Sequence, residues 1–359
     1  MKQITLLIKP ASSNCNLRCS YCFYNDVSEH REQKSYPMMS KETTIKLITR
    51  TVDSVDDDGI ITFSFQGGEP TLAGIAYFQF FVNMVNTHKK QQTIQYCLQT
   101  NGTTMNDQWG IFFHEHNFLV GVSLDGYSQN MDLFRYDIKR NSVFQKVLRC
   151  TKLLEKHQVE YNILTVVSKQ LSKEPEKLYD FYQKNHFKYV QLIPCLPSLE
   201  EGKEIDKETA LTPKDYANFF IRFHDCWKKD VQTTKYIDIN IFSNVYGLLQ
   251  GQAPYQCGML GRCFLQFVIE GDGSVFPCDF YVLDDLKMGN LNDDSFLSML
   301  QSSNANKFLK DTNPQKEPCT TCRFINICKG GCKRQNICYL DDHYCGYQAL
   351  LEHIVTSRG

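Results

Sequence analysis

Residues 13–24 read SNCNLRCSYCFY, a stretch that places Cys15, Cys19 and Cys22 on one short loop at the spacing C-x3-C-x2-C. Most cubane iron–sulfur clusters are held by four protein thiolates. Three thiolates leave one iron open to a non-protein ligand, and an open iron lets a cluster act on a bound substrate. A zinc loop is the alternative, but zinc favours four ligands, usually as two C-x2-C pairs, and no second pair lies nearby. The loop therefore predicts a catalytic iron–sulfur cluster.

The composition is that of a globular protein with an unusual number of thiols. The 359 residues are 42% hydrophobic and 22% charged, and a formal net charge of −1 gives no sign of a nucleic-acid partner. No apolar run is long enough to span a membrane, and residues 6–8 are too short an apolar run for a signal peptide. We therefore expect a cytoplasmic protein whose sixteen cysteines stay reduced and serve metal binding or catalysis.

Strand-like and helix-like segments alternate along the first two thirds of the chain. Strands are predicted at residues 4–8, 60–65, 93–98, 118–124, 159–167 and 189–193, and helices at 40–52, 77–88, 143–156 and 174–184. Six strand–helix repeats imply a parallel sheet with helical crossovers. Polar and glycine-rich residues follow the strand ends, where barrels of such units carry their chemistry. Because six units are too few for an eight-fold barrel, the prediction is an α/β fold with an open, partial β/α barrel.

The last third of the chain has a different character. Residues 197–212 are polar and are predicted to form a surface loop before a helix at 213–229. After about residue 250 cysteines become dense and helical periodicity weakens until a final helix at 344–355. We therefore predict a barrel domain over residues 1–250 and a smaller cysteine-rich domain over 251–359.

Eight cysteines lie in this C-terminal part: Cys257, Cys263, Cys278, Cys319, Cys322, Cys328, Cys332 and Cys345. Eight thiolates suit two fully ligated four-iron clusters or two structural zinc sites, and their spacing alone does not decide between them. The N-terminal loop favours clusters, because it indicates a protein in which iron–sulfur chemistry already takes place. The other five cysteines have no partner spacing and are assigned to packing, with Cys338 the least certain of them: Cys97, Cys150, Cys195, Cys226 and Cys338.

Six further motifs stand in order along the chain: LIKPASS at 7–13, FQGGEPTLAG at 65–74, LQTNG at 98–102, VSLDG at 122–126, GSVFPCDFY at 273–281 and CKGGC at 328–332. With the cysteine loop, they make the chain resemble the anaerobic sulfatase-maturating enzymes over nearly its whole length. These are radical S-adenosylmethionine (SAM) enzymes with a C-terminal extension for two auxiliary clusters, the SPASM domain. The resemblance implies a partial barrel of radical SAM type, with SAM and three [4Fe-4S] clusters as cofactors.

The resemblance also implies which residues bind the cofactors. Cys15, Cys19 and Cys22 would hold the cluster that binds SAM. The first auxiliary cluster would take Cys257, Cys263, Cys278 and Cys332, and the second Cys319, Cys322, Cys328 and Cys345. The turn Gly67-Gly68-Glu69 would receive the methionyl amine, with the Glu69 carboxylate as a hydrogen-bond acceptor. The positions that match SAM contacts are Tyr21, Gly68, Ser123, Arg135 and Leu196. Arg135 would pair with the SAM carboxylate, although by itself it would read as a surface ion pair.

Asp279 is the residue on which the predicted reaction depends, and it directly follows Cys278. Taken alone, it reads as a turn aspartate that bonds its own backbone. In the family that it resembles, the aspartate at this position is the proposed general base. A base must reach the proton that it removes and have a suitable pKa, and a carboxylate in a dry cavity meets both conditions.

The reaction implied is the oxidation of a Cys or Ser to Cα-formylglycine in an unfolded sulfatase segment, Cys/Ser-x-Pro-x-Arg. A low-potential electron donor such as a flavodoxin or ferredoxin would be the second partner, with no nucleic acid and no membrane involved. One alternative is a radical SAM maturase that forms thioether or carbon–carbon links in a ribosomal peptide. Many such enzymes carry a leader-binding domain before the cluster loop, and the fourteen residues before Cys15 leave no room for one. A non-catalytic zinc scaffold is the distant alternative.

Overall fold

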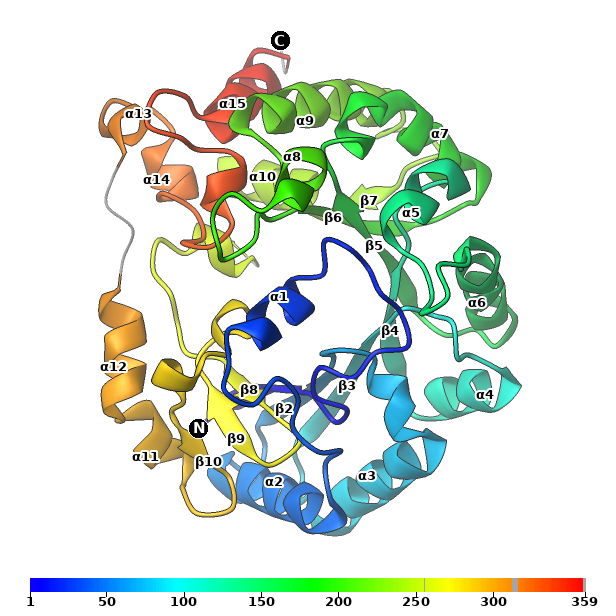
Figure 1. The fold of residues 1–359 in the computed structure, drawn as a ribbon, viewed down its shortest axis with the longest axis vertical. Coiled ribbons are helices and arrows are strands. Elements are labelled where there is room, and N and C mark those ends of the chain that lie inside the picture. Colours follow the sequence, from blue (N-terminus) through cyan, green and yellow to red (C-terminus); the bar gives the residue numbers. More distant parts are fainter. Residues whose placement is uncertain (255, 312–315, 358–359) are drawn as a thin grey trace.

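The structure, a computed structural model, describes residues 1–254, 256–311 and 316–357. One ten-stranded sheet runs through it in the order β10-β9-β8-β1-β2-β3-β4-β5-β6-β7. Figure 1 shows the sheet curving around a central space, with helices on the outside and the cysteine loop and α1 inside the ring. The predicted α/β fold with an open, partial barrel is confirmed.

The barrel is formed by parallel strands whose fully buried side chains are mainly apolar. The strands are β1 (Gln3–Ile8), β2 (Ile60–Phe65), β3 (Thr93–Thr100), β4 (Phe118–Ser123), β5 (Tyr161–Val167), β6 (Tyr189–Pro194) and β7 (Asp238–Ile239). In β1 burial alternates along the strand, so that Ile4, Leu6 and Ile8 lie in the core. The first six strands match the six predicted ones, and β7 adds a short seventh that pairs with β6.

The helices of the barrel cover the outside of the sheet. They are α2 (Lys41–Ser54), α3 (Ile75–His88), α4 (Asp107–Glu115), α6 (Phe144–Lys156), α7 (Pro175–Lys184) and α9 (Pro213–Lys228). The start of α9 illustrates why the sequence specifies them. Thr212 and Asp215 form a reciprocal capping box, and Pro213 occupies the first turn, where its missing N–H has no cost. The helix then buries Phe219, Phe220 and other aromatic side chains, and it packs against α7 and α15.

The C-terminal region shares the barrel's sheet. Strand β8 (Phe267–Ile269) pairs in parallel with β1, and β9 (Ser274–Phe276) and β10 (Gly289–Asn290) extend the sheet in antiparallel pairs. The last helix, α15 (Gly346–Thr356), packs against α9. The division at residue 250 stays a prediction about folding units, since the sheet continues across it.

Shorter helices lie outside the predicted pattern. They are α1 (Phe23–Glu29), α5 (Ser128–Phe134), α8 (Glu204–Thr209), α10 (Asn240–Leu249), α11 (Phe296–Leu300), α12 (Ser303–Lys310), α13 (Glu317–Thr320) and α14 (Ile325–Cys328). Helix α8 falls in the stretch expected to be a surface loop. There the Lys203 ammonium lies 3.1 Å from Asp26 of α1, so the stretch is tied to the cysteine loop's helix. Among the described residues no helix has the length and apolar character needed to cross a bilayer.

Candidate active site

The three N-terminal cysteines lie together between β1 and α1. Burial raises the pKa of Cys15 to about 11 and that of Cys19 to about 12, and charge on neighbouring thiols adds to both shifts. The Leu17 N–H donates to the Cys15 sulfur at 3.4 Å. None of the three forms a disulfide. Buried thiols that face one another are suited to a cluster, because metal coordination deprotonates a thiol and removes its charge from an apolar site.

The loop is fixed to the glycine turn that follows β2. Gly68 N donates to Ser12 O and Glu69 N to Asn14 O, both at 2.8 Å. A side chain on Gly68 would meet the Asn14 carbonyl oxygen at 2.1 Å, so only glycine allows this close approach. The motif FQGGEP and the cysteine loop therefore form one unit, although more than forty residues separate them.

The Glu69 carboxylate is already engaged by protein donors. It is fully buried, and its Oε1 accepts from Thr71 N, Thr71 Oγ1 and Thr100 Oγ1, while its Oε2 accepts from Asn101 N at 2.7 Å. These bonds fix the turn after β2 to the end of β3. Only Oε2 keeps room for a further donor, so backbone groups of the turn must supply much of any contact with an amine.

Arg135 is buried, not on the surface. Its Nε donates to Asp125 at 3.0 Å, and the Tyr21 hydroxyl donates to the same carboxylate oxygen. Its guanidinium lies 5.9 Å from the Tyr21 ring centroid. Asp125 follows β4 and escaped the sequence-based prediction, although the motif VSLDG contains it. The group places one arginine, fixed by a carboxylate, beside the cysteine loop.

Asp279 lies at the same end of the barrel, 14% exposed. The Tyr24 hydroxyl donates to its Oδ2 at 2.7 Å and the Gln66 amide to the same oxygen at 3.3 Å, while the Lys9 ammonium lies 3.0 Å from its Oδ1. These three partners come from α1 and from the residues after β2 and β1. The turn role expected of an isolated aspartate is therefore wrong here, because the carboxylate contacts distant segments.

The eight C-terminal thiols fall into two groups of four. In the first group burial is the main cause of the raised pKa values of Cys257, Cys263 and Cys278, and charge on Cys332 raises all three further. In the second group, charge on Cys319 raises the pKa values of Cys328 and Cys345, and charge on Cys322 that of Cys328. No disulfide joins members of either group. The thiols within each group have the membership expected from the family resemblance, and their role as ligands stays a prediction.

Cys338 lies near the first group, since charge on Cys332 adds to the burial that raises its pKa, but its thiol bonds elsewhere. It is fully buried, and its Sγ donates to the Cys195 carbonyl oxygen at 3.3 Å. Burial raises its pKa to about 12, so it stays protonated as a donor. Cys338 and Cys195 pack together, as expected for cysteines outside the ligand sets.

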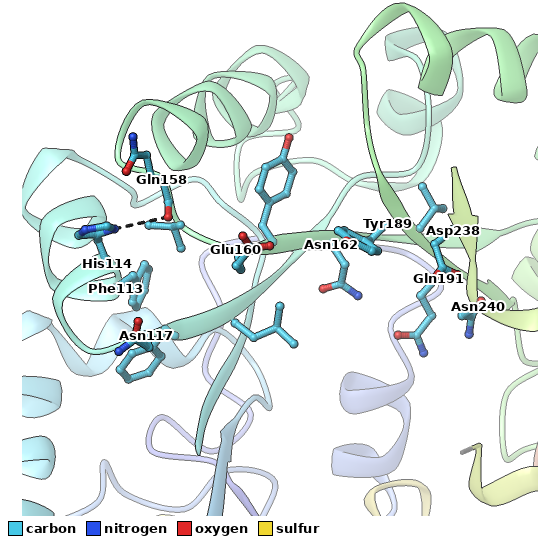
Figure 2. Close-up of a pocket in the computed structure, with 15 residues that line it drawn as sticks. Phe113, His114, Asn117, Gln158, Glu160, Asn162, Tyr189, Gln191, Asp238 and Asn240 are labelled. Atoms are coloured by element: carbon cyan, nitrogen blue, oxygen red, sulfur yellow. Dashed lines mark hydrogen bonds between the residues drawn. The ribbon is translucent and has the colours of Figure 1, made fainter. Parts of the chain in front are cut away.

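Two pockets lie at opposite ends of the barrel. The larger, about 770 Å³, is lined by the beginnings of β4 to β7 and contains no cysteine (Figure 2). The smaller, about 200 Å³, is lined by Tyr21, Cys22, Leu196 and Lys203 among others. Because thiols, Asp125 and Asp279 follow the carboxyl ends of strands, the smaller pocket is at the candidate site and the larger is not.

Comparisons with known proteins agree with this arrangement. Residues 10–182 match the radical SAM superfamily, and residues 257–323 match the iron–sulfur cluster-binding domain SPASM. A cysteine-type anaerobic sulfatase-maturating enzyme of Clostridium novyi is 41% identical over 335 residues, which cover 93% of this chain and 89% of the relative. The chain belongs to the anaerobic sulfatase-maturating enzyme family. Its cofactors are therefore iron–sulfur clusters and SAM.

Other members of the family support the same alignment along the whole chain. A serine-type enzyme of Bacteroides thetaiotaomicron is 29% identical, covering 98% of this chain and 90% of the relative. The solved structure described as native anSMEcpe with bound AdoMet superposes with a TM-score of 0.90 at 37% identity, covering 99% of this chain and 98% of that one. The SAM-bound structure of Streptococcus suis SuiB has a TM-score of 0.64 at 16% identity and shares the fold alone.

Proposed function

We propose that this enzyme oxidises a cysteine or serine in a sulfatase to Cα-formylglycine and so activates the sulfatase under anaerobic conditions. The observation that carries the proposal is Asp279, a nearly buried carboxylate that faces the barrel end where the cysteine loop lies. Cysteine is the preferred target, because the cysteine-type relatives are 38–41% identical and the serine-type ones 27–29%.

In this proposal each cluster has its own cysteines. Cys15, Cys19 and Cys22 hold the first cluster and leave one iron for SAM. The auxiliary clusters take Cys257, Cys263, Cys278 and Cys332, and Cys319, Cys322, Cys328 and Cys345. When bound, the clusters and SAM supply the radical that removes a hydrogen atom from the target Cβ and the acceptor for the second electron.

The other site residues position SAM and the peptide. Backbone groups of residues 67–69 would bind the methionyl amine, and Arg135, held by Asp125, would bind the carboxylate. Tyr21 of the cysteine loop, Ser123 at the end of β4 and Leu196 just after β6 would complete the contacts. Asp279 accepts the thiol or hydroxyl proton of the target. Serine gives the aldehyde directly, whereas cysteine gives a thioaldehyde that water hydrolyses to the aldehyde and hydrogen sulfide.

The partners and the compartment follow from this chemistry. The target is an extended sulfatase segment, Cys/Ser-x-Pro-x-Arg, which must reach the barrel end before the sulfatase folds. A flavodoxin or ferredoxin supplies low-potential electrons. We place the enzyme in the cytoplasm, where its thiols stay reduced.

The test supplies the reconstituted enzyme with SAM, a reductant and two peptides that differ only in Cys or Ser, without oxygen. Mass spectrometry should find formylglycine, faster from the cysteine peptide. Asp279→Asn should still cleave SAM but lose peptide oxidation by roughly a hundredfold, the scale of a lost general base. Asp285→Asn is the matched control, since this aspartate is exposed and only pairs with Lys307. A cross-linked peptide in place of the aldehyde would identify a maturase, and full formylglycine yield from Asp279→Asn would remove Asp279 as the base.

A further inference from the structure

Four charged side chains form one buried group around Asp279. Lys9 and Arg31 supply two positive charges, and Glu270 and Asp279 two negative charges. The Lys9 ammonium lies 3.0 Å from Asp279 Oδ1 and 3.8 Å from Glu270 Oε1, and Arg31 lies 2.9 Å from the same Glu270 oxygen. The exposed fractions of Lys9, Arg31 and Glu270 are 4%, 2% and 1%. Charges this deeply buried occur in proteins when they are paired.

The distances show how the charges divide into pairs. Arg31 forms an ion pair with Glu270 and also donates to the Lys34 carbonyl oxygen. Lys9 is nearer to Asp279 than to Glu270 by 0.8 Å. Glu270 therefore has its own cation, and Lys9 is the cation of Asp279.

The Lys9 side chain has little freedom to leave this position. Its ammonium lies 4.7 Å from the centroid of the Tyr24 ring, whose hydroxyl also bonds Asp279. Its stem passes the glycine turn so closely that a side chain on Gly67 would meet Lys9 Cγ at 3.0 Å. Its backbone N–H donates to Ile269 of β8, so Lys9 joins the barrel to the strand pair that carries Asp279.

Each carboxylate oxygen of Asp279 thus has its own partners. Oδ2 accepts from Tyr24 and Gln66, and Oδ1 faces only Lys9 among the described residues. Without Lys9 the carboxylate keeps two donors on one oxygen and is free to rotate about its Cα–Cβ and Cβ–Cγ bonds. Displacement of a reacting group by about 1 Å costs on the order of a hundredfold in rate.

We propose that Lys9 is a positioning residue that holds the Asp279 carboxylate in line for proton removal and so couples SAM cleavage to peptide oxidation. The inference rests on the proposed function, in which Asp279 is the base. Lys9 acts through Asp279 and does not contact the peptide. Its loss should leave SAM cleavage intact and slow the oxidation that uses the radical.

The test measures 5′-deoxyadenosine and formylglycine together in Lys9→Met, Lys9→Arg and the control Lys2→Met, whose side chain is 74% exposed. Lys9→Met should raise the ratio of 5′-deoxyadenosine to formylglycine by roughly ten- to a hundredfold at unchanged iron content and peptide KM. Lys9→Arg keeps the charge and should restore most of the coupling. Lys2→Met should match the wild type.

A double variant separates positioning from charge balance. Lys9→Met leaves one more negative than positive charge in the group, and Lys9→Met/Glu270→Gln restores the balance. If the double variant regains wild-type coupling, Lys9 only compensates Glu270 and the proposal is overturned. If it holds its iron and stays uncoupled, the proposal is supported, even where the single variant folds poorly. A wild-type ratio of 5′-deoxyadenosine to formylglycine in Lys9→Met itself would also overturn the proposal.

The same experiment keeps the two proposals apart. A wild-type enzyme that forms no formylglycine would refute the proposed function. An Asp279→Asn variant with normal coupling would refute Asp279 as the base. If the wild type is active and Asp279→Asn is uncoupled, normal coupling in Lys9→Met refutes only the role of Lys9.

Discussion

The two cysteine regions reach similar chemistry by different structural means. In the N-terminal region, three thiols come from residues 15–22 and lie on one loop. In the C-terminal region, one set of four draws its thiols from residues 257–332 and the other from 319–345, so the two sets interleave along the chain. Three thiols leave an iron open, whereas four close a cluster. The comparison teaches that the open site is encoded locally and the closed sites by the fold.

The two regions also differ in what holds their backbone in place. The N-terminal loop is bonded to the distant end of α5, with Arg18 N donating to Tyr136 O and Ser20 N to Phe134 O. The backbone hydrogen bonds of the described C-terminal cysteines join near neighbours, such as Cys322 N to Cys319 O at 3.4 Å. The protein therefore builds the N-terminal loop by itself and leaves much of the C-terminal geometry to the metal.

The largest expected effect comes from removing one ligand in each region. Cys15→Ala should abolish SAM cleavage, because the first cluster cannot bind SAM without its own ligands. Cys319→Ala should keep part of it, since a cluster held by four thiolates would leave no iron open to SAM. The measurement is 5′-deoxyadenosine formed per enzyme under reducing, anaerobic conditions. Cys97→Ala, a half-buried cysteine of β3, is the control and should retain full cleavage. Equal loss of SAM cleavage in Cys15→Ala and Cys319→Ala would show that the two regions do not differ in this function.

Removal of iron should increase local unfolding more in the C-terminal cysteine region than in the N-terminal loop. After chelation, the rate of amide hydrogen exchange should rise by roughly tenfold or more in residues 256–263 and 316–345. The backbone hydrogen bonds of these residues lie mainly within short turns. Residues 15–22 should keep more protection, because the Arg18 and Ser20 amides donate to the distant carbonyl oxygens of Tyr136 and Phe134. Mass spectrometry of exchanged peptides measures both. Equal opening would show that the N-terminal loop also depends on its cluster.

Much of this comparison could be predicted from the sequence, and the remainder has a physical reason. The strands β1 to β6 follow from alternating apolar residues, and the first cluster follows from spacing, because both signals are local. The pairing of Lys9 with Asp279 and of Arg31 with Glu270 is not local, since more than two hundred residues separate the partners. Likewise no local signal joins β8 to β1 or places Cys332 with Cys257. The family resemblance supplied those thiol sets, and spacing alone did not.

A smaller effect is expected at two cysteines close in sequence, Cys332 and Cys338. Cys332→Ala should lower the iron content by about four of about twelve atoms, since it removes a ligand of one cubane. Cys338→Ala should keep all the iron and lose about 1 kcal/mol of stability with its bond to the Cys195 carbonyl oxygen. Iron analysis and urea unfolding measure the two quantities. Iron loss in Cys338→Ala would place it among the ligands and change the assignment of the C-terminal sets.

A last effect concerns the contact between α9 and α15. His224 of α9 is fully buried; its Nε2 lies 3.1 Å from the Tyr246 hydroxyl of α10, and its ring centroid lies 5.4 Å from that of His353 of α15. Burial, with a contribution from charge on His353, lowers the pKa of His224 to about 4, while Asp225 opposes and Lys228 adds to the shift. Since Cys345 caps the first turn of α15, this contact also positions a predicted ligand of the second auxiliary cluster.

The sign of the pH dependence follows from the lowered pKa. Above pH 6.5 His224 is neutral in both states, so its contribution is fully present there. As the pH falls from 6.5 toward 4 the unfolded chain takes up the proton first, and stability is lost. The free energy of unfolding should be about 2 kcal/mol lower at pH 5 than at pH 7 from this group. His224→Phe should remove that part of the slope in urea titrations, whereas His343→Gln, at a residue whose side chain is 89% exposed, should not. If the free energy of unfolding of His224→Phe kept the pH dependence of the wild type, protonation of His224 would not be the cause of the loss of stability in acid.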